Sequence, residues 1–263
     1  MRGGSVTLAI HPTAVIDADA ELGECVEVGP YAVVGPGVVV GDGVRLGAHV
    51  VLERNVELAA GVVIGAGAVL GSDPQDVKYR GEPTRVTVGP RTVIREHSTV
   101  NRGTSATGLT AIGADCFLMT YVHVAHDCCV GDGVTIANAT QLSGHVTVED
   151  RVTLSGLIAV HQFVTIGTAA FVGGASRIPQ DIPPYVKAVG NPVRLFGLNT
   201  VGLSRAGISS ETLADLKHAY RLLFNATLPR AEAVAQLQDA AARTPEVARL
   251  VAFVTAARRG VPV

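Results

Sequence analysis

The chain has 263 residues, of which 48% are apolar and 17% charged, and its formal net charge is −2. This composition excludes an intrinsically disordered chain, and the near-neutral charge argues against a general nucleic-acid binder, which needs a basic face. Four cysteines do not make a disulfide framework at this length, and the sequence has neither the apolar core of a signal peptide nor a stretch able to span a bilayer, which predicts a cytoplasmic protein.

An aliphatic residue recurs at every sixth position from Ile10 to Ile178, where 26 of 29 such positions hold Ile, Leu or Val. A helix repeats near 3.6 residues and a strand at 2, so a sustained period of six is typical of a hexapeptide β-helix, in which short strands stack coil on coil. Three hexads would complete a coil of about 18 residues, giving about nine or ten coils. Glycine often follows the aliphatic residue, and we expect it to permit the turn at each corner.

Two polar segments, 72–87 and 101–111, interrupt the repeat, and the aliphatic register resumes after each. Insertions in a solenoid project from one edge and often serve binding, although a tolerated surface loop has the same composition. After Ile178 the repeat ends in a proline-rich segment. The sequence therefore predicts a parallel β-helix over residues 1–192 with loops at 72–87 and 101–111.

Residues 193–263 have a different composition, because only four of the 30 glycines lie after Asn191. Ser209 precedes a run of apolar residues at helical spacing, and two further helices are expected over 228–242 and 245–257. Thr244 and Pro245 fit the N-cap and first position of the last helix. The chain is thus predicted to be mainly β, with an α-helical C-terminal domain.

Stacking allows proximity to be predicted, since residues 18 apart should lie above one another. One coil on from His126 is position 144, beside His145, and two coils on is Gln162, beside His161. One coil back is 108, in the second loop, and three coils back is 72, where the first loop begins. His123 shares the coil of His126. These histidines and both loops are therefore expected at one edge of the prism.

Three classes of function fit a histidine column of this kind. Zinc accepts three histidines and keeps an open position in catalytic sites, as in hexapeptide enzymes of the carbonic anhydrase type. Alternatively, His126 acts as a general base in acyl transfer, with the neighbouring Asp127 orienting its ring. A non-catalytic scaffold would need flat rows of repeated residues, which the sequence lacks. Cys128 occupies an inward position and is interpreted as a small core residue rather than a nucleophile.

Five strings carry a resemblance to a known family: HVAHDC (123–128), SGHV (143–146), AVHQF (159–163), QDVKYRGEPT (75–84) and QDIPPYVKAVGNP (180–192). Over essentially its whole length the chain resembles the UDP-N-acetylglucosamine acyltransferases of Gram-negative bacteria. The resemblance implies a left-handed β-helix and a homotrimer with active sites in the clefts between subunits. It also implies transfer of a 3-hydroxyacyl chain from acyl carrier protein to the 3-hydroxyl of UDP-N-acetylglucosamine, which begins lipid A (lipopolysaccharide) biosynthesis, without a metal or other cofactor.

The same resemblance assigns roles to individual residues. His126 matches the general base, Asp127 its carboxylate partner, and Gly156 the residue whose backbone amide stabilises the oxyanion. The residues that match substrate contacts are Asp76, Lys78, His123, His145, His161, Gln162, Asn199 and Arg205. Gly174 matches the position that limits acyl-chain length, and glycine there implies a longer chain than a bulky residue would allow.

The chain departs from some relatives at two places near the motif. Asn101 stands where some have histidine, and Tyr121 adds a ring close to the catalytic coil. The residues do not distinguish a hydroxyl from an amine at sugar position 3, which leaves a related hexapeptide N-acyltransferase as an alternative, and they do not fix the donor length. Because carrier proteins are acidic, the candidates for a docking surface are Arg205, Arg221, Arg258 and Arg259.

Overall fold

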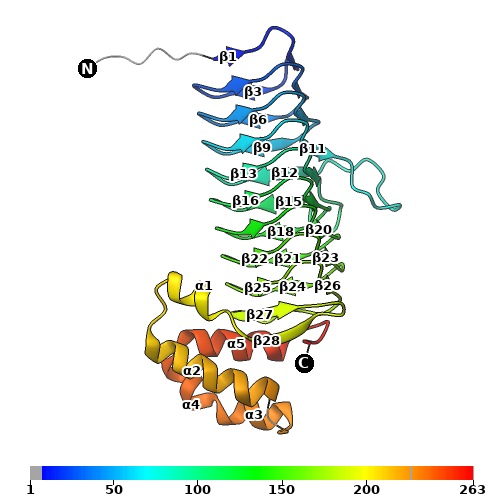
Figure 1. Ribbon diagram of the computed structural model, residues 1–263. Coiled ribbons are helices and arrows are strands. Elements are labelled where there is room, and N and C mark those ends of the chain that lie inside the picture. The colour runs from blue at the N-terminus through cyan, green and yellow to red at the C-terminus, as the bar shows by residue number, and fades with distance from the viewer. Residues whose placement is uncertain (1–7, 226, 263) are drawn as a thin grey trace, which may run out of the picture.

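The computed structural model describes residues 8–225 and 227–262, which form a tall prism of stacked strands with a helical unit beyond its last coil (Figure 1). Every third strand joins the same parallel sheet, so the chain winds through sheets A, B and C in turn. The fold is a left-handed parallel β-helix of hexapeptide repeats.

The three sheets are built mostly from two-residue strands. Sheet A contains β1 (Ala9–Ile10), β4 (Glu27–Val28), β7 (Arg45–Leu46), β10 (Val63–Ile64), β13 (Val93–Ile94), β16 (Phe117–Leu118), β19 (Thr135–Ile136), β22 (Thr153–Leu154), β25 (Phe171–Val172), β27 (Val186–Val189) and β28 (Arg194–Leu198). Sheet B contains β2 (Val15–Ile16), β5 (Val33–Val34), β8 (Val51–Leu52), β11 (Val69–Ser72), β14 (Thr99–Asn101), β17 (His123–Val124), β20 (Gln141–Leu142), β23 (Ala159–Val160) and β26 (Arg177–Ile178). Sheet C contains β3 (Glu21–Leu22), β6 (Val39–Val40), β9 (Val56–Leu58), β12 (Arg85–Val88), β15 (Leu109–Ile112), β18 (Cys129–Val130), β21 (Thr147–Val148) and β24 (Thr165–Ile166).

Strand pairing confirms the predicted coil of three hexads and shows what the insertions do to it. Val33 pairs with Val51, as that coil length requires, whereas Val63 pairs with Val93 and Val93 with Phe117. The first insertion therefore lengthens its coil by two hexads and the second by one. Both lie between a strand of sheet B and the next strand of sheet C, an edge that we call the B–C edge.

The lengthened coils correct the stacking expected below His126. His123 pairs with Thr99, so one coil back is a step of four hexads there rather than three. The residues beneath His126 are consequently those at the end of β14, not position 108, and residue 72 lies two coils back rather than three. The expected convergence on one edge is nevertheless present, because both loops leave from the B–C edge.

The aliphatic residue of each hexad points into the prism and forms its core. Leu52, Ile64 and Leu118 are fully or almost fully buried, and the fifth position of the hexad is buried as well, as at Val26 and Val38. In most two-residue strands one side chain therefore faces inward and one outward. Two inward positions per hexad account for the continuous apolar core along the prism.

The expected role of the glycine that follows the aliphatic residue is confirmed at Gly71 (φ 83°) and is wrong at the other such glycines. The left-handed backbone falls two positions later and is adopted by residues such as Tyr31 (φ 58°), Asp127 (φ 61°) and His145 (φ 62°). A Cβ at Gly29 would lie only 2.8 Å from the carbonyl carbon of Gly47, and one at Gly89 only 2.5 Å from that of Gly113. These glycines are thus required by the close approach of successive coils.

The hexad pattern ends at Ile178, but sheet pairing continues beyond it. β27 continues sheet A in parallel with β25, and β28 returns antiparallel to β27, so sheet pairing extends to Leu198, beyond the expected boundary at 192. The helices that follow are α1 (Thr200–Arg205), α2 (Ser210–Tyr220), the π-helical turn η1 (Arg221–Asn225), α3 (Arg230–Gln236), α4 (Gln238–Arg243) and α5 (Pro245–Ala256).

The helix predicted after Ser209 is confirmed, and the Ser209 hydroxyl accepts a hydrogen bond from the Thr212 amide. The helix expected over 228–242 is divided at Leu237, and α1 was not expected. Thr244 precedes α5 as predicted, but its hydroxyl donates to Asp215 Oδ2 at 2.6 Å instead of capping the helix. Leu216, Leu237 and Leu250 pack with residues of the last coils. None of the helices in residues 8–225 and 227–262 is long and apolar enough to cross a membrane.

Candidate active site

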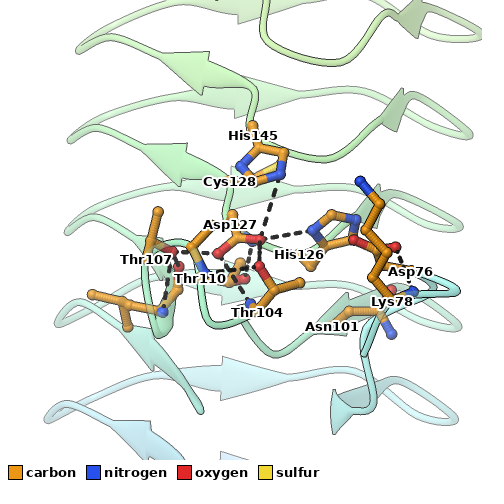
Figure 2. Close-up of polar contacts among 12 residues, drawn as sticks. Asp76, Lys78, Asn101, Thr104, Thr107, Thr110, His126, Asp127, Cys128 and His145 are labelled. Carbon is orange, nitrogen blue, oxygen red and sulfur yellow. Dashed lines mark hydrogen bonds and ion pairs between the residues drawn. The ribbon is translucent and has the colours of Figure 1, made fainter. Parts of the chain in front are cut away.

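His126 and Asp127 lie at the B–C edge, where β17 passes into β18 (Figure 2). The imidazole is largely buried, and its Nδ1 donates to Asp127 Oδ2 at 2.8 Å. Since Nδ1 is occupied by the carboxylate, Nε2 is the ring nitrogen left for a ligand. A histidine held in this way, with one tautomer selected by a carboxylate, is equipped to accept a proton at Nε2.

The Asp127 side chain is completely buried (0% exposed) and accepts hydrogen bonds from the second insertion. The Thr104 amide donates to Oδ1 at 3.0 Å, its hydroxyl donates to Oδ2 at 2.8 Å, and the Thr107 hydroxyl donates to Oδ1. Burial acts to raise the pKa of Asp127, but the hydrogen bonds from Thr107, His126 and Thr104 outweigh it and hold the pKa below its ordinary value. Asp127 therefore remains a carboxylate. Sequence reasoning missed both threonines.

Directly above His126 lies Gly144, on the next coil of the prism. A Cβ at Gly144 would lie 2.6 Å from Cε1 and 2.7 Å from Nε2 of His126, so only glycine leaves room for the ring. The residue was missed, although the step of one coil from His126 pointed to it. Because Gly144 has no side chain, Nε2 of His126 is left uncovered on this side.

His145 and Phe163 extend the column along the same edge. His145 Nε2 is 3.7 Å from Asp127 Oδ2, its ring stands perpendicular to that of His126 with centroids 5.2 Å apart, and it stacks on Phe163 at 4.4 Å. Asp127, His145 and Phe163 all have the left-handed backbone at successive corners. The column is therefore held by corner geometry as well as by ring stacking. Phe163 was not among the predicted site residues.

The first insertion brings Asp76 and Lys78 to the same place. Figure 2 shows both side chains on the His126 side of Asp127, opposite Thr107. One pocket is lined by Gln75, Asp76, Val77, Lys78, His126, His145, Gln162 and Phe163. Two loop residues, the expected base, His145 and Gln162 thus meet around one hollow, as the sequence predicted. The pocket combines a carboxylate, an ammonium group and neutral polar groups.

His123 and His161 are not among the residues that line this pocket. His123 Nδ1 is hydrogen-bonded to Thr99 Oγ1 at 2.7 Å, and burial, with the nearby His126, lowers its pKa. His161 lies at the B–C edge but is exposed, and its Nδ1 is bonded to the carbonyl of Gln162 at 3.1 Å. Of the predicted grouping, His161 therefore shares the edge, and His123 lies on β17, the strand that leads into it.

Four predicted site residues lie away from the B–C edge, three at other edges of the prism and one in a helix. Gly156 and Gly174 stack at the A–B edge, where a Cβ on Gly174 would lie 3.2 Å from the Gly156 oxygen. Asn199 caps α1 by accepting from the Gly202 amide and donates to the Ala169 carbonyl at 3.0 Å, near the C–A edge. Arg205 lies in the last turn of α1. A single chain therefore does not bring these four residues to His126.

The three-histidine zinc set considered from sequence does not form. Among residues 8–225 and 227–262, the group with suitable ligand atoms within 4.8 Å of one another is His126, Asp127 and His145, without His161. The oxygens of Asp127 already accept bonds from Thr104, Thr107 and His126. This donor set is built to orient an imidazole. Burial also raises the pKa of the Cys128 thiol to about 12, which confirms its interpretation as a core residue.

Known proteins resemble this chain in sequence and in architecture. A family model described as Udp N-acetylglucosamine O-acyltransferase, domain 2, matches residues 181–262, and one for bacterial transferase hexapeptide repeats matches 19–54, 37–72 and 110–144. An acyl-[acyl-carrier-protein]–UDP-N-acetylglucosamine O-acyltransferase of Anaeromyxobacter dehalogenans is 44% identical over 97% of this chain and 99% of the relative.

Solved structures agree with this result. UDP-N-acetylglucosamine acyltransferase of Francisella novicida has a TM-score of 0.94 at 32% identity, covering 96% of this chain and 93% of that one. UDP-N-acetylglucosamine O-acyltransferase of Moraxella catarrhalis has a TM-score of 0.92 at 38% identity, covering 97% and 99%. The resemblance inferred from the five sequence strings is confirmed.

Proposed function

Since the chain belongs to the family of acyl-[acyl-carrier-protein]–UDP-N-acetylglucosamine O-acyltransferases, we propose that it transfers a 3-hydroxyacyl chain from acyl carrier protein to the 3-hydroxyl of UDP-N-acetylglucosamine, the first step of lipid A biosynthesis. The observation that carries the proposal is the buried His126–Asp127 pair, whose free ring nitrogen borders the pocket lined by Asp76 and Lys78. The names of the relatives specify an O-acyltransferase, which favours a hydroxyl over an amine as acceptor.

The His126–Asp127 pair accounts for both proton transfers. Nε2 of His126 takes the proton of the sugar hydroxyl as its oxygen attacks the thioester carbonyl carbon. The buried carboxylate of Asp127 stabilises the imidazolium that results. When the tetrahedral intermediate collapses, the carbon–sulfur bond breaks, and the imidazolium returns its proton to the leaving thiolate. An ester and a free thiol are formed, and His126 is neutral again.

The pocket residues support an assignment of the two substrates to neighbouring hollows. Asp76, Lys78, His145 and Gln162 would contact the sugar nucleotide, because they share a pocket with His126, and His123 and His161 would contact ligand groups at its margin. Arg258 and Arg259 line the adjoining hollow with His145, Phe163 and others. They are therefore better placed to receive the carrier arm than Arg205 or Arg221, which belong to α1 and η1.

A homotrimer would complete the site. Gly156, Gly174 and Asn199 lie at other edges of the prism and Arg205 lies in α1, so they would reach substrates held at His126 from a neighbouring chain. In a cleft between two prisms, the Gly156 amide would face the developing oxyanion, and Gly174 would leave room for a long acyl chain. A cytoplasmic location is consistent with the four free cysteines.

The test is product formation by purified, chelator-treated protein given UDP-N-acetylglucosamine and a panel of 3-hydroxyacyl carrier proteins. O-acylated sugar is expected from the wild type, and His126→Ala should lower the rate by about 10²–10⁴-fold because the general base is lost. The variant should keep the wild-type melting temperature. Activity only after zinc is restored, or only on an amino sugar, would replace the proposal with the zinc enzyme or the N-acyltransferase.

A further inference from the structure

Two consecutive side chains at the end of β14 tie the first insertion to the prism. The guanidinium of Arg102, 2% exposed, donates to the Gly71 carbonyl, pairs with the Asp73 carboxylate, and donates to the Tyr79 hydroxyl at 3.0 Å. Asn101 Nδ2 donates to the Asp73 carbonyl at 2.9 Å. We call Asn101 and Arg102 the loop clamp.

The clamp is the support that reaches the middle of the insertion. Among the hydrogen bonds of residues 8–225 and 227–262, the one from Arg102 to Tyr79 is the single link between residues 74–83 and the prism. The other bonds there are local, such as Lys78 N to Asp76 Oδ1 at 2.9 Å. Pro74 is buried at the start of this segment, but Val77 is 92% exposed, so packing contributes little at the tip. The position of Asp76 and Lys78 therefore depends on Arg102.

Asn101 and Arg102 are not the residues that would stabilise the folded protein most at this position. A buried guanidinium is desolvated, and its removal from water is only repaid by complete hydrogen bonding. Yet Arg102 Nε and Asn101 Oδ1 are buried without a hydrogen-bond partner among the protein atoms of residues 8–225 and 227–262. Apolar residues would fill the end of β14 at lower cost, so the arrangement favours a role in positioning.

We propose that Arg102 is a positioning residue for the nucleotide-sugar pocket: through Asp73 and Tyr79 it holds Asp76 and Lys78 against His126, and it thereby sets the affinity for the acceptor substrate without touching it. The inference rests on the proposed function, since it names the acceptor as the substrate of this pocket. We expect Arg102 to affect the acceptor only, because the carrier arm is assigned to the adjoining hollow, which the insertion does not line.

Tyr79→Phe tests the clamp with the smallest change, because it removes only the hydroxyl that accepts from Arg102. The same hydroxyl donates to the Glu82 carbonyl at 3.0 Å, but that bond lies within the insertion and does not tie it to the prism. The KM for UDP-N-acetylglucosamine should rise about tenfold, as expected for one lost hydrogen bond to a charged donor, with kcat, the KM for the acyl carrier and the melting temperature unchanged. Trypsin should cleave faster after the exposed Lys78 and Arg80. Tyr31→Phe, at another edge, is the matched control and should behave as the wild type.

Arg102→Lys separates positioning from folding. It keeps the charge but not the planar fork, and should raise the same KM and the same cleavage rate. Unchanged KM and cleavage in both variants would overturn the proposal, as would parallel losses of kcat and melting temperature in Arg102→Lys. If the wild type does not acylate UDP-N-acetylglucosamine, the proposed function fails, while the cleavage rates still report whether the clamp holds the loop.

Discussion

Asp127 combines two requirements in one residue. Its backbone is in the left-handed region at φ 61°, which aspartate and asparagine tolerate better than other residues with a side chain. Its carboxylate is also buried against three donors and the His126 ring. Asparagine would keep the corner but lose the charge, so the two requirements can be separated by one substitution.

Asp127→Asn should lower the acyl-transfer rate by about two to four orders of magnitude, because the imidazolium is no longer stabilised. Stability should respond to pH as well. The pKa of Asp127 is lowered in the folded protein, so the unfolded chain binds the proton more readily, and the stabilisation present at pH 7 is lost as the pH falls below about 4. Urea unfolding between pH 3 and 7 should show the wild type and the variant converging at the acid end. Parallel curves would contradict the assignment.

Sequence period alone gives the elements of the prism, because each hexad must bury its aliphatic residue. The same period gave the grouping of His126, His145, Gln162 and the loops. It did not give Thr104, Thr107 or Arg102, because an insertion has no period from which its contacts follow. The role of the glycine that follows many aliphatic residues was also predicted wrongly. Glycine is selected both where the backbone must be left-handed and where no Cβ fits, and the sequence does not distinguish the two.

Two glycine substitutions distinguish a glycine required by the packing of successive coils from one required by the His126 ring. In Gly29→Ala the new Cβ meets the backbone of Gly47, so the free energy of unfolding should fall by about 1–3 kcal/mol while activity at low temperature is kept. In Gly144→Ala the Cβ meets the His126 ring, so activity should fall by about a hundredfold at an unchanged melting temperature. Each variant is the control for the other. Equal losses of stability would refute the distinction.

At the scale of the molecule, the location of His126 and Gly174 at different edges of the prism predicts the activity of trimers that contain two different variants. His126→Ala and Gly174→Met should each be inactive with long-chain donors, the first for lack of a base and the second for lack of room. In trimers reassembled from equal amounts of both, a cleft would draw His126 from one chain and Gly174 from its neighbour, so about one quarter of the clefts should be intact. Activity near one quarter of the wild type is expected in a rate assay. No recovery would mean that each site is complete within one chain.

The last coil of the prism explains why further chains do not add to the end of the β-helix. A stack of strands has no natural stopping point, since each exposed terminal strand is a template for another chain. Here β28 turns back against β27, and the helices pack on the residues beyond, with the Gly260 carbonyl accepting from the Asp181 amide at 2.9 Å. The helical unit thus caps the C-terminal end of the prism and blocks the addition of another chain at that end.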